Sequence, residues 1–316
     1  MVLSIIIVNW NSVAFLRRCL ASIYSDSHRS KMEVIVVDNA SFDGSEEVVR
    51  SEFPQVRFVQ SQENLGFARA NNLGYASSSG HALLFLNPDT EVRAGALSQM
   101  LCQLCSMQRV GAVGCRLLNA DLSTQTSCLQ AIPTIWNQLI DSDYLKLAFP
   151  RWKMWGMRPL FSSKATSDEV QMISGACLMV RREVFESVGL FSPEYFMYGD
   201  DVDLCHKIKQ AGYVLRYVAD AVVIHHGGKS SSCVKTDHFA DVLIREAVWR
   251  FVRKTHSPLY AAVYRVATAS VALGRVLVLL MLWPIAAQRI GPGPLSKWLA
   301  ILRWAVGGRA PIPAKT

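Results

Sequence analysis

The strongest constraint on the fold of this chain is a regular alternation of short apolar runs with segments of helical spacing over the first 90 residues. The nearly continuous apolar run at residues 2–9 predicts a strand buried on both faces of a sheet. Apolar residues three and four apart then predict a helix; they are Phe15, Leu16, Cys19, Leu20 and Ile23. Residues 33–37, 56–60 and 81–86 repeat the strand pattern with helical segments between them. Such alternation predicts an α/β fold with a doubly wound, mostly parallel sheet and right-handed crossovers.

Two aspartates fall at the ends of predicted strands. Asp38 follows residues 33–37, and Asp89 lies in the Asn87-Pro-Asp-Thr90 turn after residues 81–86. Because ligands of such sheets bind beyond the carboxyl ends of the strands, both acids are expected at a binding edge. From its position alone, Asp38 suits two roles equally well, a hydrogen bond to a nucleotide and a cap for the following helix.

The middle of the chain predicts a long loop and then a return to the sheet. A strand is expected at residues 111–115, and an irregular, proline-containing stretch follows at about 117–170, a length typical of functional or mobile loops. Residues 172–180 predict a buried strand, and Asp200-Asp-Val-Asp203 begins a segment with helical spacing. Strands at 213–218 and 221–224 then lead to His225.

Composition indicates the kind of partner. Lys and Arg exceed Asp and Glu by 33 − 25 = 8, which suits nucleotide diphosphates, anionic lipid headgroups or nucleic acid. The eight cysteines show no paired framework and are expected to be reduced and buried. The spacing of Cys102 and Cys105 fits a metal site, but no second pair or nearby histidine accompanies it. The N-terminus lacks the features of a secretory signal, so the body of the protein is expected in the cytosol.

The C-terminal part differs in character from the rest. Residues 263–287 are almost wholly apolar, but Arg265 and Arg275 interrupt the run and Pro284 is expected to break its end. A charge at the centre of a spanning helix costs about 2.5–3.5 kcal/mol, so a helix lying in the membrane interface is favoured over a spanning one. The alternative is a helical hairpin that packs on the domain or against a second copy in a homodimer.

Seven segments, in this order and spacing, resemble glycosyltransferase family 2 and, within it, the rhamnosyltransferase-like branch. They are Ile7-Val-Asn-Trp-Asn11, Val37-Asp-Asn-Ala-Ser-Phe-Asp-Gly-Ser45, Asn64-Leu-Gly-Phe-Ala-Arg-Ala-Asn-Asn72, Leu86-Asn-Pro-Asp-Thr90, Ile173-Ser-Gly-Ala-Cys177, Gly199-Asp-Asp-Val-Asp-Leu-Cys205 and Ile224-His-His-Gly-Gly-Lys-Ser230. The resemblance covers residues 1 to about 255. It implies a GT-A-type nucleotide-diphospho-sugar transferase domain over residues 1–255, followed by a membrane-associated helical tail at 256–316.

The resemblance also implies how the donor is bound. In the similar enzymes the position of Asp38 contacts the base or ribose of the nucleotide. The other residues expected to bind the nucleotide sugar are Asn9, Asn11, Asn64, Arg69, Asn72, Asn87 and Lys229. The glycines before Lys229 let the backbone approach a diphosphate closely.

Metal and base roles follow from the same resemblance. Asp89 is expected to bind Mg²⁺ or Mn²⁺, although Asn87 replaces the first acid of the family's Asp-x-Asp motif. His225 matches a family histidine that binds the metal or the diphosphate. Asp201 is expected to be the base, with Asp200 in the position of the family's glutamate as a positioning acid.

The resulting prediction is an inverting, metal-dependent glycosyltransferase that moves a sugar, with rhamnose implied by resemblance, onto a lipid-linked or polysaccharide acceptor in cell-envelope glycan synthesis. It is expected at the cytoplasmic face of the inner membrane, held there peripherally or monotopically. A non-catalytic subunit of a polysaccharide assembly complex is the alternative. A dinucleotide-dependent oxidoreductase is disfavoured because no G-x-G-x-x-G follows the first strand. The basic residues gather beside the apolar C-terminus rather than on a base-stacking face, which disfavours nucleic-acid binding.

Overall fold

A computed structural model of the chain describes residues 2–25, 32–161, 168–227, 238–290 and 293–308; of residues 143 and 283–290 it describes the backbone only. The chain forms two compact units that interleave along the sequence. Unit 1 comprises residues 1–132, 149–196 and 200–233, and unit 2 comprises residues 133–148, 197–199 and 234–316. The division into domains at residues 255 and 256 stays a prediction of the sequence.

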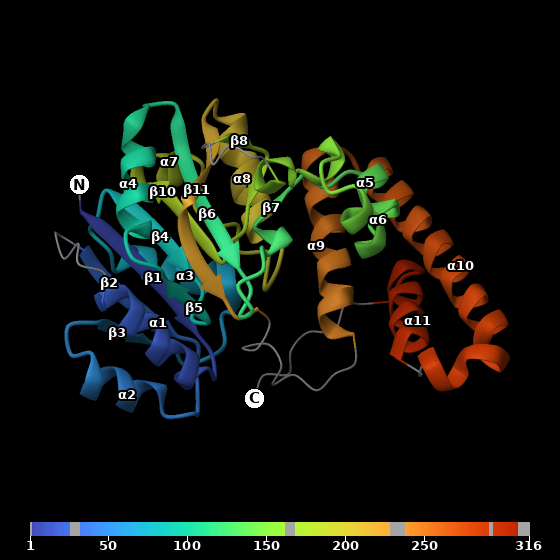
Figure 1. The fold of residues 1–316 in the computed structure, drawn as a ribbon, viewed down its shortest axis with the longest axis horizontal. Coiled ribbons are helices and arrows are strands. Elements are labelled where there is room, and N and C mark those ends of the chain that lie inside the picture. The colour runs from blue at the N-terminus through green and yellow to red at the C-terminus, as the bar shows by residue number, and fades with distance from the viewer. Residues whose placement is uncertain (1, 26–31, 162–167, 228–237, 291–292, 309–316) are drawn as a thin grey trace. The chain divides into compact units, whose positions relative to one another are not determined.

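Unit 1 is built on one mixed sheet with the strand order β3-β2-β1-β4-β10-β6-β11-β5 (Figure 1). Its first half is parallel, as predicted, and consists of β1 (Leu3–Asn9), β2 (Met32–Asp38), β3 (Arg57–Gln60) and β4 (Ala82–Leu86). Isoleucines of β1 and leucines of β4 are fully buried, because helices cover both faces of the sheet.

The second half of the sheet departs from the parallel pattern. Strand β10 (Cys177–Arg181) lies antiparallel between β4 and β6 (Val110–Leu118), and β5 (Thr90–Val92) lies antiparallel to β11 (Val214–His225). Strands β6 and β11 are parallel to each other. The two strands expected at 213–218 and 221–224 form the single strand β11, whose register against β6 shifts between Val218 and Val222. Strand β8 (Asp168–Val170) lies antiparallel to β11, along the edge of β11 opposite β6.

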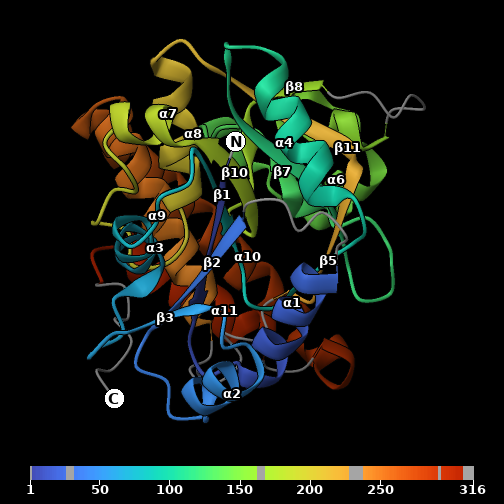
Figure 2. The same cartoon turned by 90° about the vertical axis from the view of Figure 1, so that its left-hand side faces the viewer.

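Helices flank the sheet of unit 1 on both faces. Helices α1 (Val13–Ser25), α2 (Ser45–Glu52) and α4 (Ala96–Ser106) lie on one side, and α3 (Gly66–Ala76), α7 (Arg182–Ser187) and α8 (Asp200–Gln210) lie on the other (Figure 2). Helix α3 approaches β1 closely at Gly74, where an added Cβ would meet Ile6 Cγ2 at 2.4 Å. The rings of Phe85, Phe185 and Phe191 form a cluster with tilted and edge-on contacts at β4.

The long stretch after β6 contains several short elements. In unit 1 these are the 3₁₀ turns η1 (Thr126–Cys128), η2 (Lys153–Trp155) and η3 (Arg158–Phe161), and the paired strands β7 (Leu129–Gln130) and β9 (Met172–Ile173). In unit 2 they are α5 (Ile135–Leu139) and α6 (Asp143–Ala148). Phe149, Trp152 and Trp155 stack as three near-parallel rings.

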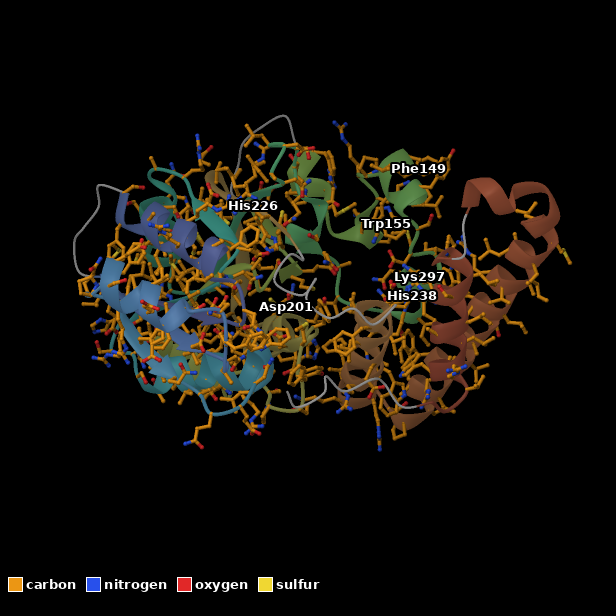
Figure 3. All side chains as sticks on the ribbon, turned by 90° about the horizontal axis from the view of Figure 1, so that it is seen from below. Phe149, Trp155, Asp201, His226, His238 and Lys297 are labelled. Carbon is orange, nitrogen blue, oxygen red and sulfur yellow. The ribbon has the colours of Figure 1, made fainter. Side chains whose placement is uncertain are left out.

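Unit 2 contains the three long helices α9 (Phe239–Thr255), α10 (Pro258–Ile290) and α11 (Gly293–Ala305). Residues at the start of α9 bond to α11: Asp241 Oδ1 lies 2.6 Å from Lys297 Nζ, and His238 Nε2 lies 2.7 Å from Ser296 Oγ (Figure 3). Arg265 of α10 sits beside the rings of Trp249 and Trp304. This arginine therefore stabilises the packing of the helices in unit 2.

Helix α10 continues through Pro284, so the expectation that this proline ends the apolar helix is wrong. A proline removes one N–H and bends a helix, but the flanking hydrogen bonds can carry the helix past it. By length and composition, the part from Pro258 to Leu282 is apolar enough to cross a membrane, and 17% of its most apolar stretch is buried. The exposed apolar residues include Val266, Leu273, Val278 and Met281.

Candidate active site

Asp38 ends β2 and is held in a network of hydrogen bonds. Asn9 Nδ2 donates to its Oδ1 at 2.8 Å, and Gln60 Nε2 and the Ser41 N–H donate to its Oδ2 at 3.0 and 2.8 Å. The residue at the N-cap of α2 is Gly44, so the capping role that the sequence left open for Asp38 is not the one adopted. A carboxylate offers about four lone-pair sites, and the described residues use three of those of Asp38.

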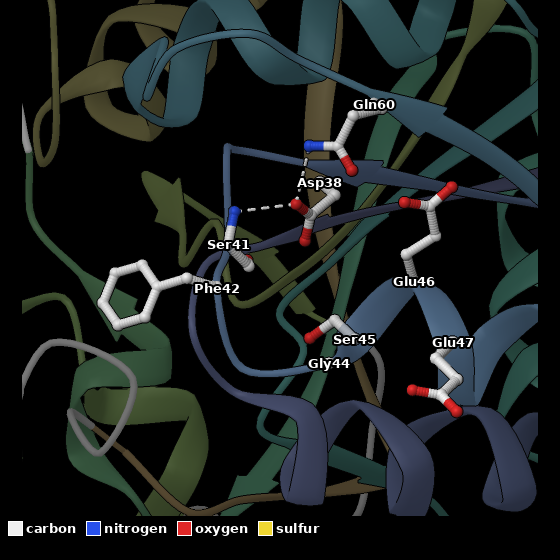
Figure 4. A pocket seen from close by; sticks show the side chains of 8 residues that line it. All are labelled: Asp38, Ser41, Phe42, Gly44, Ser45, Glu46, Glu47 and Gln60. Carbon is white, nitrogen blue, oxygen red and sulfur yellow. Dashed lines mark hydrogen bonds between the residues drawn. The ribbon is translucent and has the colours of Figure 1, made fainter.

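A pocket of about 510 Å³ opens beside this carboxylate (Figure 4). It is lined by Asp38, Ser41, Phe42, Gly44, Ser45, Glu46, Glu47 and Gln60. Three acidic side chains at its wall disfavour an anionic group, whereas amide, hydroxyl and carboxylate groups suit the polar edge of a base or a ribose. The side chain of Phe42 is 80% exposed and offers a ring at the rim.

Asn9 and Asn11 hold the loop that forms the pocket, and neither lines it. Asn9 is fully buried, and its Nδ2 also donates to Ser45 Oγ at 2.9 Å. Asn11 has φ of 47°, and its Oδ1 accepts from the Phe42 N–H at 2.9 Å. Both asparagines therefore position the 41–45 loop, and their direct contact with a nucleotide stays a prediction.

The polar side chains in and before α3 differ in whether they are hydrogen-bonded to the backbone or exposed. Asn64 Oδ1 accepts from the Gly66 N–H at 2.9 Å, in the turn that leads into α3. Both ends of the Asn72 amide bond to the backbone of Phe191, at 2.8 and 3.1 Å, which is a structural role that the sequence did not predict. Arg69 is exposed, and its contact with the donor stays a prediction. Lys229 lies outside the described residues.

Asp89 lies just beyond β4 and is 1% exposed. Among the residues that the structure describes, neither of its carboxylate oxygens has a hydrogen-bond partner. His225 Nε2 lies 3.3 Å from Oδ1 of Asp89. Because an unpaired buried charge is costly, this carboxylate fits a bound cation.

His225 and Asn87 complete the surroundings of Asp89. Strand β11 pairs with β5 so that His225 lies opposite Thr90, and His225 Nε2 lies 3.3 Å from Asn87 Nδ2. The other ring nitrogen, Nδ1, lies 2.7 Å from Oε1 of Gln125, a residue that no sequence signal pointed to. No group of three or more His, Cys, Asp or Glu side chains with metal-binding geometry occurs within the described ranges. A metal here would have Asp89 and His225 as its protein ligands.

Asp200 and Asp201 begin α8. Asp201 Oδ2 accepts from the Gly175 N–H at 2.9 Å, and its Oδ1 accepts from the Val202 N–H at 2.8 Å. Burial raises the pKa of Asp201, against the opposing effect of these backbone donors. Burial, with the charge of Asp201 second, raises the pKa of Asp200 well above its usual value. Asp203 is buried as well, and it accepts from Ser192 Oγ at 2.5 Å.

The peptide at Gly175 and Ala176 brings the two candidate sites to one edge of the sheet. The Ala176 carbonyl accepts from the Asn87 N–H at 3.0 Å, and the neighbouring Gly175 N–H holds Asp201. Asp89 is two residues from Asn87, so the base candidate and the cation candidate lie beyond the same end of β4. Both acids therefore lie at the same edge of the sheet, and their action on one ligand stays a prediction.

Two of the described cysteines lie at the surface. The seven described cysteines form no disulfide with one another, and Cys102 and Cys105 are exposed, which corrects the expectation that all cysteines are buried. Their helix, α4, packs its other face on the sheet, so both thiols point outward.

The fold and these acids define a class of enzyme, the GT-A-type glycosyltransferases. The structure is similar to a mannosyltransferase from Pyrobaculum calidifontis in complex with GDP-Man and Mn²⁺, with a TM-score of 0.58 and 19% identity over 96% of this chain and 84% of that one. It is also similar to S. aureus TarS in complex with UDP-GlcNAc, with a TM-score of 0.56 and 13% identity over 97% and 81% of the two chains.

The chain belongs to glycosyl transferase family 2, whose model matches residues 4–189. The model of glycosyl transferase family group 2 matches residues 123–307. A curated relative is the N-acetylglucosaminyl-diphospho-decaprenol L-rhamnosyltransferase of Mycobacterium tuberculosis, 29% identical over 84% of this chain and 88% of its own. An O-antigen biosynthesis protein of Myxococcus xanthus is 26% identical over 68% of this chain and 16% of its own length. The protein is therefore a glycosyltransferase.

Proposed function

We propose that this enzyme transfers rhamnose, with inversion and with the help of a divalent cation, from a nucleotide diphosphate donor to a lipid-linked acceptor at the cytoplasmic face of the membrane. The observation that carries the proposal is the unpaired, buried carboxylate of Asp89 at the same strand end as Asp201. The choice of rhamnose and of a lipid-linked acceptor is supported by the mycobacterial relative, whose name specifies both.

Different residues at this edge of the sheet would hold the nucleoside and the diphosphate of the donor. The free lone pair of Asp38 would accept a hydrogen bond from the base or ribose in the pocket beside Gln60. Asp89 and His225 would hold Mg²⁺ or Mn²⁺ next to the diphosphate. A bound divalent cation supplies positive charge that stabilises the leaving diphosphate.

Asp201 would act as the general base. An acceptor hydroxyl forms a bond to the anomeric carbon while the bond from that carbon to the diphosphate oxygen breaks, and the hydroxyl proton passes to the Asp201 carboxylate. A single displacement of this kind inverts the anomeric configuration. The hydrogen bond from the Gly175 N–H fixes one carboxylate oxygen, which orients the base before the acceptor arrives.

The helices of unit 2 would keep the enzyme at the membrane, close to a lipid-linked acceptor. Helix α10 presents apolar side chains to its surroundings, among them Val278 at 52% and Met281 at 74% exposure. Arg275 lies against the ring of Trp298, a pairing typical of the headgroup region of a bilayer.

The proposal is tested with purified full-length protein in detergent, Mn²⁺, a panel of nucleotide sugars and a prenyl-diphosphate-linked acceptor. We expect transfer from dTDP-rhamnose, with the anomeric configuration of the product inverted when read by NMR. Asp201→Asn is expected to lower kcat by about 10²–10⁴-fold, the usual contribution of a general base. Asp220→Asn removes an exposed carboxylate of the same unit and serves as the matched control.

Different results overturn different parts of the proposal. Release of nucleotide diphosphate only from another donor would exclude rhamnose. Full activity of Asp201→Asn would exclude this residue as the base. Absence of any transfer or release, with every donor, would favour a non-catalytic assembly subunit.

A further inference from the structure

The chemical form of His225 decides whether it can bind a cation. A neutral imidazole carries its proton on one nitrogen and a lone pair on the other, and only the lone pair can bind a metal. His225 Nε2 faces Asp89 Oδ1 at 3.3 Å, and Nδ1 faces Gln125 Oε1 at 2.7 Å. The proton must therefore sit on Nδ1 if Nε2 is to be a ligand.

A chain of hydrogen bonds in the loop after β6 determines which ring nitrogen of His225 carries the proton. The chain starts at the exposed carboxylate of Asp121, where the hydrogen bond from the Ser123 side chain lowers the pKa. An ionised carboxylate only accepts, so the Ser123 hydroxyl donates its one proton to Asp121 Oδ1, at 2.6 Å. The Ser123 N–H donates to the same oxygen at 3.0 Å.

Each following bond inherits its direction from the one before. Ser123 Oγ has given its proton away, so it accepts from Asn119 Nδ2 at 2.9 Å. Asn119 then turns its Oδ1 toward Gln125 Nε2, at 3.1 Å. The other end of the Gln125 amide is an oxygen, and it faces His225 Nδ1. An oxygen at this place requires a proton on Nδ1.

We propose that Gln125 is a positioning residue that holds His225 as the Nδ1–H tautomer, with the Nε2 lone pair directed at the cation site beside Asp89. This inference rests on the proposed function, because it assumes that the cation of the donor complex binds there. It gives Asn119 and Ser123 a part in the orientation of a side chain 100 residues further along the chain from Gln125.

The contact of His225 with Asn87 agrees with this assignment. Asn87 Nδ2, an N–H donor, lies 3.3 Å from Nε2, where it meets a lone pair. Asn87, which replaces the first acid of the family's Asp-x-Asp motif, thus donates a hydrogen bond to the Nε2 lone pair until a cation binds there. Partners that orient a metal-binding histidine typically change metal affinity by about 10–100-fold when they are removed.

The test compares three variants of the full chain. Gln125→Met keeps the length of the side chain but removes the acceptor, whereas Gln125→Glu keeps an acceptor for Nδ1–H. Gln130→Met alters an exposed glutamine of the neighbouring strand β7, which bonds to the Ser127 carbonyl instead, and is the matched control. Circular dichroism and thermal melting establish that each variant is folded.

Two readouts are independent of turnover. The first is the Kd of Mn²⁺, titrated into cation-free protein in the presence of nucleotide diphosphate. We expect Gln125→Met to raise this Kd by about 10–100-fold and Gln125→Glu to stay within about threefold of wild type. The second is the ¹⁵N NMR spectrum of His225 in cation-free protein, assigned by comparison with His225→Gln, which is expected to show an N–H at Nδ1 only.

Each outcome bears on one inference. An N–H at Nε2 in wild-type protein, or equal Mn²⁺ affinity of wild type and Gln125→Met, would overturn the positioning role. If wild-type protein binds no Mn²⁺, the metal site of the proposed function is overturned, and so is the role of His225 Nε2 as a metal ligand. In that case the NMR spectrum still decides the tautomer separately.

Discussion

Replacement of Asp89 by asparagine is expected to stabilise the cation-free protein while it removes sugar transfer. Both oxygens of this carboxylate are buried, and the described residues give them no hydrogen bond. A neutral buried polar group without a partner costs about 1–3 kcal/mol, and a charged one costs more. Asparagine keeps the shape of the side chain and removes the charge.

The magnitude follows from these costs. Relief of the excess penalty of the charge should raise the free energy of unfolding by about 1 kcal/mol or more, which corresponds to a melting temperature about 2–4 °C higher per kcal/mol. Mn²⁺ at about 100 times its Kd should add about 2.7 kcal/mol to wild-type protein only. The cation is therefore expected to raise the melting temperature of wild type by about 5–11 °C and that of Asp89→Asn hardly at all.

The assay is thermal melting of both proteins in EDTA and across a Mn²⁺ titration, with Asp220→Asn as the control for a lost surface carboxylate. Steady-state transfer is measured in parallel. A lower melting temperature of Asp89→Asn in EDTA would show that the carboxylate has a stabilising partner. An equal Mn²⁺-dependent rise in both proteins would refute Asp89 as the ligand.

Three further perturbations test other parts of the structure. An added Cβ at Gly175 would lie 3.3 Å from Asp201 Cβ, so Gly175→Ala should move the base by a few tenths of an ångström. Since a 1 Å displacement costs about 10²-fold, kcat should fall by about three- to fivefold in steady-state assays, with the donor KM unchanged. The raised pKa of Asp200 means that the folded state disfavours its ionised form, so stability is lost as pH rises above the unfolded value of 3.8. Asp200→Asn should therefore melt above wild type at pH 8, with the difference vanishing below pH 3.8, as calorimetry would reveal. Met281→Glu should lower the binding constant for anionic vesicles, measured by sedimentation, by about 10–100-fold, because burial of such a side chain contributes about 1.5–3 kcal/mol. An unchanged binding constant would exclude this face of α10 from the membrane.

The prediction from sequence was most accurate where the spacing of apolar residues within one segment determines its secondary structure. Strands β1, β2 and β4 lie within a residue or two of the predicted ranges, because burial on both faces makes their apolar runs continuous. The direction of β10 was not predictable in the same way. Its apolar run reads alike in a parallel or an antiparallel setting, and only the path of the preceding chain decides.

The sequence by itself determined the α/β class, the family and the short list of acids, because each of these is written in neighbouring residues. Only the tertiary structure decided which groups the polar side chains contact. Asn72 proved to clamp the Phe191 backbone, and Gln125 proved to meet His225. The physical reason is that a hydrogen bond depends on which groups approach within about 3 Å, and those groups come from segments that no local period relates.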